Sequence, residues 1–332
     1  MPDAVLAGVG AWTPPRIVTN DDLAAYLDTS DEWIYSRTGI RQRRIADPGV
    51  ATSDLAVEAG ARALKSAEID HVDAVILATT TPDRPCPATA PDVASRLGVT
   101  GIAAFDVAAV CSGFLYALAA AAGLIATEVA GTVLVIGAET YSTILNPTDR
   151  TTRALFGDGA GAVVLRAGRA DEPGALGPFD LGSDGRYAEL ISIPGGGSRQ
   201  RSTGRPAPDG DQYFVMQGQP VFRHAIVRMA ESALAVIDRA GWRVDDIDRF
   251  VAHQANRRIL VRVARRLGIP EERCVMNLER VANTAAASIP LALADAVADG
   301  RLRPGHRVLL TAFGGGFTWG ATTVRWPDIT PA

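Results

Sequence analysis

The sequence predicts an α/β fold built from two related halves. Short apolar, strand-like segments alternate with helical patterns, and three segments of the first half recur in the same order in the second. The chain has 332 residues, 47% of them hydrophobic, which is enough for roughly two domains with a sizeable core. We place the two halves at residues 1–170 and 171–332.

Six segments have the length and composition of β-strands. Each is short, apolar or β-branched, and closed by Gly, Thr or Pro. They are residues 75–79, 133–137, 161–165, 250–252, 308–312 and 321–324.

Helical patterns lie between these strands. Residues 54–66 follow a Thr-Ser pair suited to helix capping, and residues 220–240 place apolar side chains at helical spacing. Residues 194–211 are rich in Gly, Ser, Arg and Pro, so we expect an exposed loop there.

One uncharged segment, residues 107–127, is nominally long enough to cross a bilayer. It is mostly Ala and Gly, and acidic residues flank it without a cluster of basic ones. We therefore expect a helix buried on all sides within a soluble fold. Its small residues Gly113, Ala117 and Ala121 recur every four positions, which predicts one face that another element approaches closely.

The internal repeat has a period of about 170–175 residues. A long period with two copies indicates a duplicated α/β unit. The matching pairs are Asp73-Ala-Val-Ile-Leu with Asp248-Arg-Phe-Val-Ala, Ala94-Ser-Arg-Leu-Gly-Val with Ala264-Arg-Arg-Leu-Gly-Ile, and Val133-Leu-Val-Ile-Gly-Ala with Val308-Leu-Leu-Thr-Ala-Phe.

Charge and cysteine content restrict location and partners. Lys and Arg number 33 against 37 Asp and Glu, a net charge of −4 that argues against bulk binding to nucleic acid or a membrane surface. Three Cys do not form a disulfide framework and suit a reducing compartment. The N-terminal residues lack the basic segment of a signal peptide, so we expect a cytoplasmic protein. No residues have metal-ligand spacing, so we expect no metal site.

The repeat brings three reactive residue types to the ends of elements. It aligns Cys111, at the start of the uncharged helix, with Asn283, which begins a second small-residue helix, and His253 ends the strand 250–252. A helix N-terminus is expected to lower the pKa of Cys111 and prepare it as a nucleophile. From the residues alone, Cys111 could equally be a small buried hydrophobe, and His253 a hydrogen-bonded strand-end histidine.

Two glycine-rich segments differ in their implications. Residues 157–161 lack the full spacing of a dinucleotide fingerprint and lead into a strand, so we expect close chain packing there. Residues 314–316 follow a strand and can direct backbone N–H groups at a developing negative charge.

Together these residues resemble the β-ketoacyl-acyl carrier protein synthase III family. The matching motifs extend from about residue 5 to residue 325. They are DTSDEWI at 28–34, RTGI at 37–40, FDVAAVCSGF at 105–114, DR at 149–150, FGDGAG at 156–161, HQAN at 253–256, NT at 283–284 and GGGFTWG at 314–320. The resemblance implies the thiolase fold, two duplicated α/β halves in a five-layered αβαβα arrangement, and a homodimer.

The resemblance also implies a reaction in two stages. Cys111 takes an acyl group from acyl-CoA, and malonyl-acyl carrier protein then loses CO2 and condenses with it, which starts a fatty-acid or polyketide chain. His253 and Asn283 hydrogen-bond the malonyl thioester carbonyl and stabilise the enolate. Backbone N–H groups of Cys111 and Gly315 form the oxyanion hole, and Phe313 lines the malonyl site. Decarboxylation makes the carbon nucleophile, so no cofactor is implied.

By the same resemblance, Trp33, Arg37, Arg150 and Asn256 bind the CoA or phosphopantetheine arm, with Trp33 stacking and the two arginines meeting phosphates.

Residues 255–267 predict a helix with one basic face. The face carries Arg258, Arg262, Arg265 and Arg266, a pattern that a simple solvated surface can also have. Carrier proteins of this pathway are acidic and Arg258 matches a docking position of the family, so we expect this face to bind acyl carrier protein.

Two departures from the family pattern stand out. The usual Gly-Asn-Thr-Ser reads Ala282-Asn283-Thr284-Ala285, which keeps the Asn in an altered loop. Cys86 occupies a position where acetyl-primed members often carry an aromatic residue that reaches the partner's acyl pocket. We therefore expect primers longer or more branched than acetyl.

Three other functions remain open at this stage. One is an acyltransferase of the same fold that moves an acyl group from Cys111 to an alcohol or amine in secondary metabolism. The others are a thiol hydrolase and a non-catalytic partner subunit. The presence of Cys111, His253 and Asn283 together favours the condensing enzyme.

Overall fold

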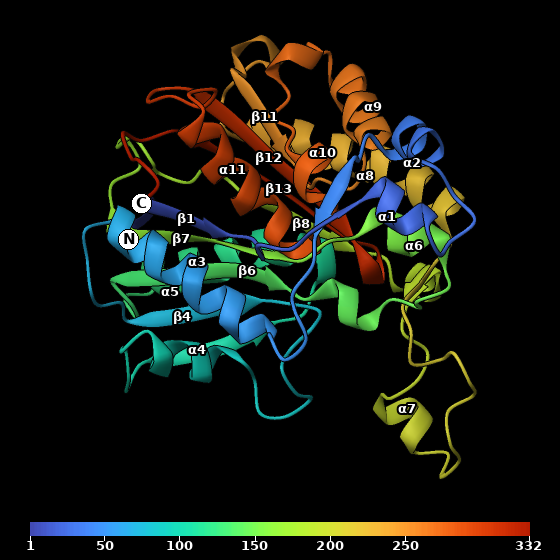
Figure 1. Ribbon diagram of the computed structural model, residues 1–332. Coiled ribbons are helices and arrows are strands. Elements are labelled where there is room, and N and C mark those ends of the chain that lie inside the picture. The colour runs from blue at the N-terminus through green and yellow to red at the C-terminus, as the bar shows by residue number, and fades with distance from the viewer.

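Two β-sheets form the framework of the computed structural model, which describes residues 1–332. The first sheet has the strand order β1-β7-β6-β4-β5 and the second β11-β12-β13-β8. Their bounds are β1 Asp3–Trp12, β4 Ala74–Ala78, β5 Ala103–Val107, β6 Thr132–Glu139, β7 Gly159–Gly168, β8 Asp180–Ser183, β11 Arg249–Ala252, β12 Arg307–Gly314 and β13 Thr318–Arg325. In Figure 1 the first sheet, coloured blue to green, lies below β11, β12 and β13 of the second, which are coloured orange to red.

Strand directions match between the two sheets. β4 runs parallel to β6, which is antiparallel to β7, which is antiparallel to β1. In the second sheet β11 runs parallel to β12, which is antiparallel to β13, which is antiparallel to β8. The duplicated α/β fold class is therefore confirmed, whereas the expected domain boundary near residue 170 stays a prediction.

Helices cover both sheets and separate them, which gives five layers. The outer layer on the first sheet is α3 (Thr52–Ser66) with α4 (Ala90–Arg96), and that on the second sheet is α8 (Gly218–Arg239) with α9 (Arg257–Leu267). Between the sheets lie α5 (Gly113–Ala126) and α11 (Ser288–Ala298). No helix of the chain is both long and apolar enough to cross a membrane.

The central strands of the first sheet are almost entirely apolar because they are buried on both faces. In β4, Val75 and Leu77 belong to the core under α3, and Ile76 and Ala78 belong to the core between the sheets. Successive side chains of a strand point to opposite faces, so both sets must be apolar. This explains why the strands read as continuous hydrophobic segments.

Equivalent helix ends support the duplication. α4 is followed by Gly98 at φ +79°, and α9 ends at Gly268 at φ +81°. In both places the residue after the glycine donates its N–H to a carbonyl in the last turn of the helix. Val99 donates to the Ala94 carbonyl at 3.0 Å, and Ile269 donates to the Ala264 carbonyl at 2.9 Å. Glycine reaches this left-handed conformation without strain, which accounts for the repeated Ala-x-Arg-Leu-Gly pattern.

Small residues let α11 approach the first sheet closely. A Cβ added to Gly161 would lie 2.7 Å from the Leu291 nitrogen, and one added to Gly137 would overlap the Ala286 carbonyl. This confirms a packing role for glycines in residues 157–161. Gly113, Ala117 and Ala121 are likewise buried, as expected.

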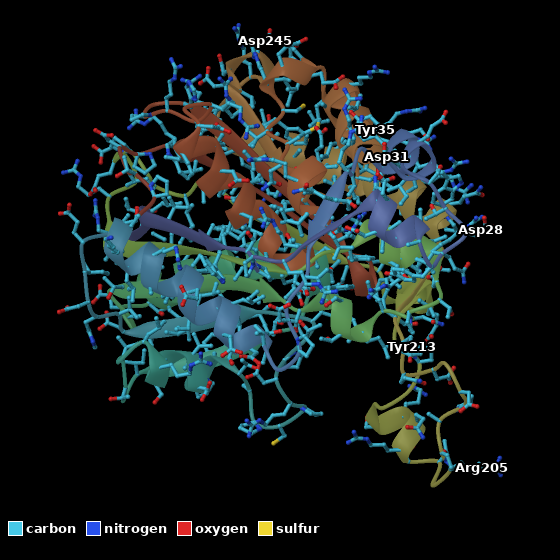
Figure 2. All side chains as sticks on the ribbon, in the orientation of Figure 1. Asp28, Asp31, Tyr35, Arg205, Tyr213 and Asp245 are labelled. Carbon is cyan, nitrogen blue, oxygen red and sulfur yellow. The ribbon has the colours of Figure 1, made fainter.

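Three expectations need correction. The uncharged segment 107–127 begins as the end of β5, passes through a 3₁₀ turn and becomes helical at Gly113, and one face of that helix is only half-buried. Residues 194–211 are mostly exposed but contain the short helix α7 (Ser198–Arg201). Figure 2 shows Arg205 far out on this projecting segment.

The strand β1 was not predicted because Gly8 and Gly10 interrupt its apolar pattern, and both glycines make room for α3.

Shorter elements complete the chain. They are β2 Ile17–Thr19, α1 Asn20–Ala24, α2 Asp31–Thr38, β3 Gln42–Arg44, α6 Arg150–Leu155, β9 Ile191–Ser192, β10 Val215–Met216 and α10 Leu278–Val281.

Candidate active site

One cavity of about 100 Å³ collects the candidate catalytic residues from both halves. Cys111, His253, Asn283, Phe313 and Asn256 all line it. The remaining wall is mostly apolar and includes Phe156, Phe214, Met216 and Phe222. The thiol of Cys111 thus shares a mostly apolar cavity with three polar side chains, those of His253, Asn256 and Asn283.

Cys111 lies in a sharp turn directly before α5. The turn is the 3₁₀ segment Val110–Ser112, in which Val110 adopts φ +47°. Ser112 Oγ lies 2.7 Å from Thr318 Oγ1, and a Cβ on Gly314 would come within 2.8 Å of the Cys111 nitrogen. The second half of the chain therefore holds the Cys111 turn in place.

The expectation that the pKa of Cys111 is lowered is wrong, because its pKa is raised. Burial raises the pKa of the Cys111 thiol, and the negative charge of Glu139 raises it further. Desolvation of the thiolate and the charge of Glu139 together outweigh the backbone hydrogen bond that favours the thiolate. The neutral thiol form of Cys111 is therefore favoured over the thiolate.

Glu139, at the end of β6, is a buried carboxylate that sequence reasoning missed. It accepts the Thr80 backbone N–H at 3.0 and 3.1 Å, the Thr81 hydroxyl at 2.9 Å and the Ala286 backbone N–H at 3.4 Å. Burial raises the pKa of Glu139 to about 7, against the effect of these donors. The carboxylate joins the first half to the turn that follows Asn283. The sequence signal that could have revealed Glu139 is a single acidic residue just after the apolar segment 133–137.

His253 follows β11 and is buried, with its ring on the cavity wall. Its backbone N–H donates to the Thr311 carbonyl at 2.9 Å, and its Nδ1 lies 2.7 Å from Ser288 Oγ. Burial lowers the pKa of His253 to about 3, so the imidazole is neutral near pH 7.

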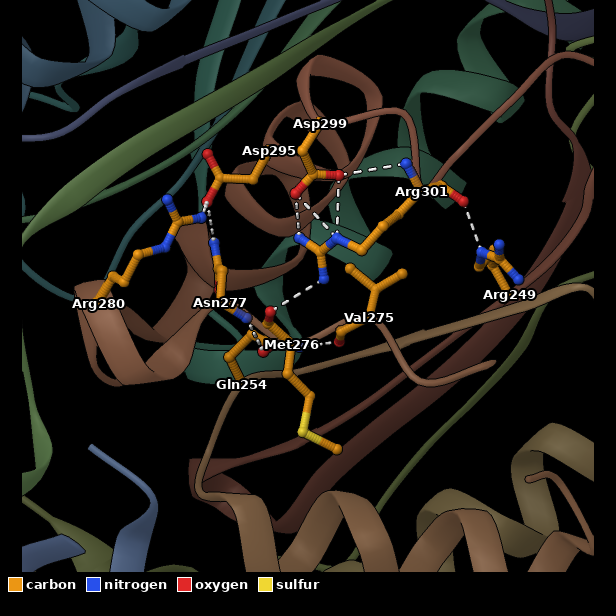
Figure 3. Close-up of polar contacts among 9 residues, drawn as sticks. All are labelled: Arg249, Gln254, Val275, Met276, Asn277, Arg280, Asp295, Asp299 and Arg301. Atoms are coloured by element: carbon orange, nitrogen blue, oxygen red, sulfur yellow. Dashed lines mark hydrogen bonds and ion pairs between the residues drawn. The ribbon is translucent and has the colours of Figure 1, made fainter. Parts of the chain in front are cut away.

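The residue after His253 is fixed by a polar network drawn in Figure 3. Gln254 Nε2 donates to the carbonyls of Ala252 at 2.7 Å and Val275 at 3.1 Å, and Gln254 Oε1 accepts the Asn277 N–H at 3.1 Å. Asn277 Nδ2 in turn donates to Asp295 at 2.9 Å. These bonds leave the end of β11 little freedom to move.

Asn283 lies in a strained turn after α10. Its Oδ1 accepts the Ala285 backbone N–H at 2.9 Å, which leaves its Nδ2 protons available to a ligand. Its backbone N–H donates to the Leu155 carbonyl at 3.0 Å. The preceding Ala282 has φ +61° and ψ −159°, a region that only glycine occupies readily.

Only part of the segment from Phe313 to Gly315, at the end of β12, lines the cavity as expected. Phe313 and Gly314 line the cavity, whereas Gly315 does not belong to its wall and is buried beside Val110 and Ile191.

The predicted CoA-binding residues fall into two places. The guanidinium carbon of Arg37 lies 4.5 Å and that of Arg150 lies 4.9 Å from the Trp33 ring centre, so these three form one surface cluster. Arg150 also donates to the Asp28 carbonyl at 2.6 Å, and Figure 2 labels Asp28 beside α2. Asn256 lies on the cavity wall instead, and its Oδ1 caps α9 by accepting the Ile259 N–H at 2.9 Å.

The basic face of α9 borders the cavity. A hollow of about 350 Å³ shares Gly218 and Phe222 with the catalytic cavity and is also lined by Arg223 and Arg258. Sequence reasoning missed Arg223, although it lies within the predicted helix 220–240.

A second surface hollow, of about 290 Å³, is lined by Arg258, Arg262 and Arg265 together with Tyr35 and Ser36. Arg266 does not line it. None of the four predicted docking arginines forms an ion pair within the chain.

Cys86 is exposed on the loop after β4 and does not line the cavity of its own chain. No three His, Cys, Asp or Glu side chains are grouped so that they could hold a metal ion.

Comparisons with known proteins agree on one family. The model of the 3-oxoacyl-[acyl-carrier-protein] synthase III C terminal matches residues 237–326, and the 3-oxoacyl-[acyl-carrier-protein] synthase III model matches residues 105–185. Beta-ketoacyl-[acyl-carrier-protein] synthase III 5 of Streptomyces coelicolor is 64% identical, with 98% of each chain covered. A Pseudomonas aeruginosa beta-ketoacyl-[acyl-carrier-protein] synthase III is 52% identical over 99% of this chain and 98% of its own.

Solved structures give the same result. The crystal structure of 3-oxoacyl-(acyl carrier protein) synthase III from Pseudomonas aeruginosa PAO1 has a TM-score of 0.93 and 51% identity, covering 99% of this chain and 100% of that one. The priming beta-ketosynthase from the R1128 polyketide biosynthetic pathway has a TM-score of 0.90 and 34% identity, covering 99% and 98%.

Proposed function

Since this chain belongs to the 3-oxoacyl-[acyl-carrier-protein] synthase III family and is an enzyme of that type, we propose that Cys111, His253 and Asn283 perform its reaction. The reaction is decarboxylative condensation of an acyl-CoA primer with malonyl-acyl carrier protein. One observation carries the assignment of residues: a thiol from the first half and two hydrogen-bonding side chains from the second line the same cavity.

The first step transfers the primer to Cys111. The sulfur attacks the acyl-CoA carbonyl, the C–S bond to CoA breaks, and the thiol proton leaves with CoA as free CoA-SH. Because Cys111 is a neutral thiol before substrate arrives, its proton must be lost as the new bond forms. We assign the oxyanion hole to the backbone N–H groups of Cys111 and Gly315, since Gly315, although not part of the cavity wall, packs against Val110 next to Cys111.

The second step makes and uses a carbon nucleophile. The malonyl carboxylate leaves as CO2, and its electron pair forms an enolate on the thioester carbonyl. His253 and Asn283 stabilise this negative oxygen by donating hydrogen bonds, and Phe313 packs beside the malonyl group. The enolate carbon attacks acyl-Cys111 and releases the cysteine. Loss of CO2 drives the step, so we expect no cofactor.

Binding of the CoA arm is assigned to the Trp33, Arg37 and Arg150 cluster and to Asn256. A Trp ring flanked by two guanidinium groups suits stacking with adenine and contact with phosphates. Asn256 uses Oδ1 for helix capping, which leaves Nδ2 for the pantetheine amides.

Docking of acyl carrier protein is assigned to the face of Arg258, Arg262, Arg265 and Arg266. The absence of intrachain ion pairs supports this role, because paired charges would be neutralised already. Arg258 lies where the docking face meets the catalytic cavity, which suits delivery of a tethered malonyl group.

We also propose a homodimer in the cytoplasm. β5 is an edge strand that pairs only with β4, and Phe105 on it is 36% exposed. Pairing with the same strand of a second copy would cover this edge. All three cysteines are free, in keeping with a reducing compartment.

A half-reaction assay tests the assignment. The protein is incubated with an acyl-CoA and ¹⁴C-carboxyl-labelled malonyl-acyl carrier protein, and acyl-Cys111, released CO2 and 3-ketoacyl product are measured. We expect all three, with Cys111→Ala giving neither acyl-enzyme nor 3-ketoacyl product. Acylation without CO2 release, followed by transfer to an alcohol or amine, would support an acyltransferase instead. Absence of acylation would support a non-catalytic subunit.

A further inference from the structure

The imidazole of His253 makes one side-chain contact that the reaction scheme does not use. Its Nδ1 lies 2.7 Å from the hydroxyl oxygen of Ser288, the first residue of α11. The same oxygen accepts the backbone N–H of Gln254 at 3.3 Å. Ser288 is buried, and its hydroxyl has no other hydrogen-bond partner within the chain.

The hydrogen bonds of the Ser288 hydroxyl determine which nitrogen of the His253 ring carries the proton. A backbone N–H is always a donor, so the serine oxygen accepts from Gln254. If Nδ1 also carried a proton, the hydroxyl would accept twice and its own proton would be buried without an acceptor, which is unfavourable. The hydroxyl therefore donates to Nδ1, and the ring proton lies on Nε2.

This arrangement matches what the condensation requires. Nε2 has no hydrogen-bond partner within the chain, and the ring lines the cavity that holds Cys111 and Asn283. A proton on Nε2 makes this nitrogen a donor for a thioester oxygen, whereas a bare Nε2 would repel the enolate. Burial lowers the pKa of His253 to about 3, so the ring does not become doubly protonated near neutral pH.

We propose that Ser288 is a positioning residue for the condensation, because its hydroxyl holds His253 in the Nε2–H tautomer. The inference rests on the proposed function of His253. The backbone N–H of Gln254 contributes by donating to the Ser288 hydroxyl oxygen, which leaves the hydroxyl proton free to point at Nδ1 of His253. The side-chain hydrogen bonds of Gln254 hold this N–H in place.

The first test is the tautomer itself, which does not depend on activity. The protein is labelled with ¹⁵N-histidine, and His253 is assigned by the signals missing from His253→Ala. We expect wild-type shifts of a neutral ring protonated at Nε2, and a mixture of tautomers in Ser288→Ala. A wild-type ring protonated at Nδ1 would overturn the proposal, even if the enzyme condenses as proposed.

The second test separates the two half-reactions. Removal of an oxyanion donor costs about 10²–10³ in kcat, so loss of its orientation in Ser288→Ala should cost less, about tenfold in kcat for condensation. Acylation by acyl-CoA should stay within twofold, and Ser288→Thr, which keeps the hydroxyl, should recover most of the loss. Equal losses in both half-reactions, or wild-type condensation in Ser288→Ala, would overturn the proposal.

Ser232→Ala is the matched control. Ser232 is also a buried serine, and its hydroxyl donates to the Asp180 carbonyl at 3.3 Å, away from His253. It should leave both the condensation rate and the His253 signals unchanged. If the wild-type enzyme forms no 3-ketoacyl product, the proposed function fails, and the tautomer measurement still decides the role of Ser288.

Discussion

The turns before α5 and α11 occupy equivalent places in the two halves and supply different chemistry. The first presents the thiol of Cys111, and the second presents the side-chain amide of Asn283. The 3₁₀ turns Val110–Ser112 and Ala285–Ala287 each begin with a non-glycine residue at positive φ: Val110 at +47° and Ala285 at +44°. Cys111 lies inside its turn, whereas Asn283 lies two residues before the matching one, so a duplicated turn brings a nucleophile from one half and a hydrogen-bond donor from the other to a single cavity.

A second pair of equivalent elements differs in charge. In α4, Arg96 pairs with Asp54 at 2.8 Å and with Asp92 at 3.6 Å. In α9, Arg258 and its three neighbours on the docking face form no ion pair. The first half neutralises the charge of its outer helix, and the second keeps it available for a partner.

The largest expected effect separates the two turns. Cys111→Ala should abolish acylation and condensation, because the acyl group has no attachment. Asn283→Ala should keep acylation within twofold and lower condensation by about 10²–10³-fold, as expected for loss of one donor to the enolate. Acyl-enzyme formation is followed by mass spectrometry and condensation by formation of the 3-ketoacyl product. Equal loss of both steps in Asn283→Ala would show that the turns do not divide the chemistry.

The loops after β4 and β11 provide the next contrast. The loop after β11 places His253 in its own cavity, whereas the loop after β4 carries Cys86 away from it. If Cys86 shapes the partner's acyl pocket, Cys86→Phe should lower the ratio of kcat/KM for isobutyryl-CoA over acetyl-CoA by about tenfold. Cys274→Ala should leave the ratio unchanged. A clear preference of the wild-type enzyme for acetyl-CoA would contradict the idea of a wider pocket.

The contrast between α4 and α9 can be tested by charge reversal. Arg258→Glu should raise KM for malonyl-acyl carrier protein by about five- to tenfold, with less effect at high salt. Acylation by acyl-CoA should be unchanged, since that step needs no carrier. Lys65→Glu, an equal charge change on α3 at an exposed position without an ion pair, is the control. A similar loss in acylation would argue against a docking role.

The buried carboxylate of the first half gives a pH-dependent prediction. Glu139 raises the pKa of Cys111, so its charge opposes formation of the thiolate. Glu139→Gln should move the pH dependence of Cys111 alkylation by iodoacetamide toward lower pH, because the neutral amide no longer repels the thiolate. Glu128→Gln, at an exposed position, should not shift it. A shift to higher pH, or none, would remove Glu139 from this role.

The smallest effect concerns the altered turn at Ala282. The backbone strain at Ala282 costs up to about 3 kcal/mol. Replacing Ala282 by glycine relieves this strain but loses roughly 1.5 kcal/mol, because a buried methyl group is removed and the unfolded chain gains conformational entropy. Ala282→Gly should therefore raise the free energy of unfolding by about 1 kcal/mol, measured by urea denaturation. Ala287→Gly, at an ordinary φ of −75°, should lower it. Destabilisation by both changes would show that the turn is not strained.

Much of the fold was predictable because it depends on local patterns. Strands buried on both faces appear as apolar segments, and the capping glycines of α4 and α9 repeat with the halves. The strands β1 and β5 were missed because glycines that admit α3 interrupt the first, and the second reads as part of the uncharged segment.

At the site, the sequence by itself determined which chemical groups were present and which half carried each: the thiol of Cys111, the imidazole of His253 and the amide of Asn283. Only the tertiary structure decided their states. Burial and the charge of Glu139 raise the pKa of Cys111, and the contact with Ser288, thirty-five residues from His253, sets the tautomer of the ring. Desolvation and distant hydrogen bonds depend on how the halves pack together, which no local pattern records.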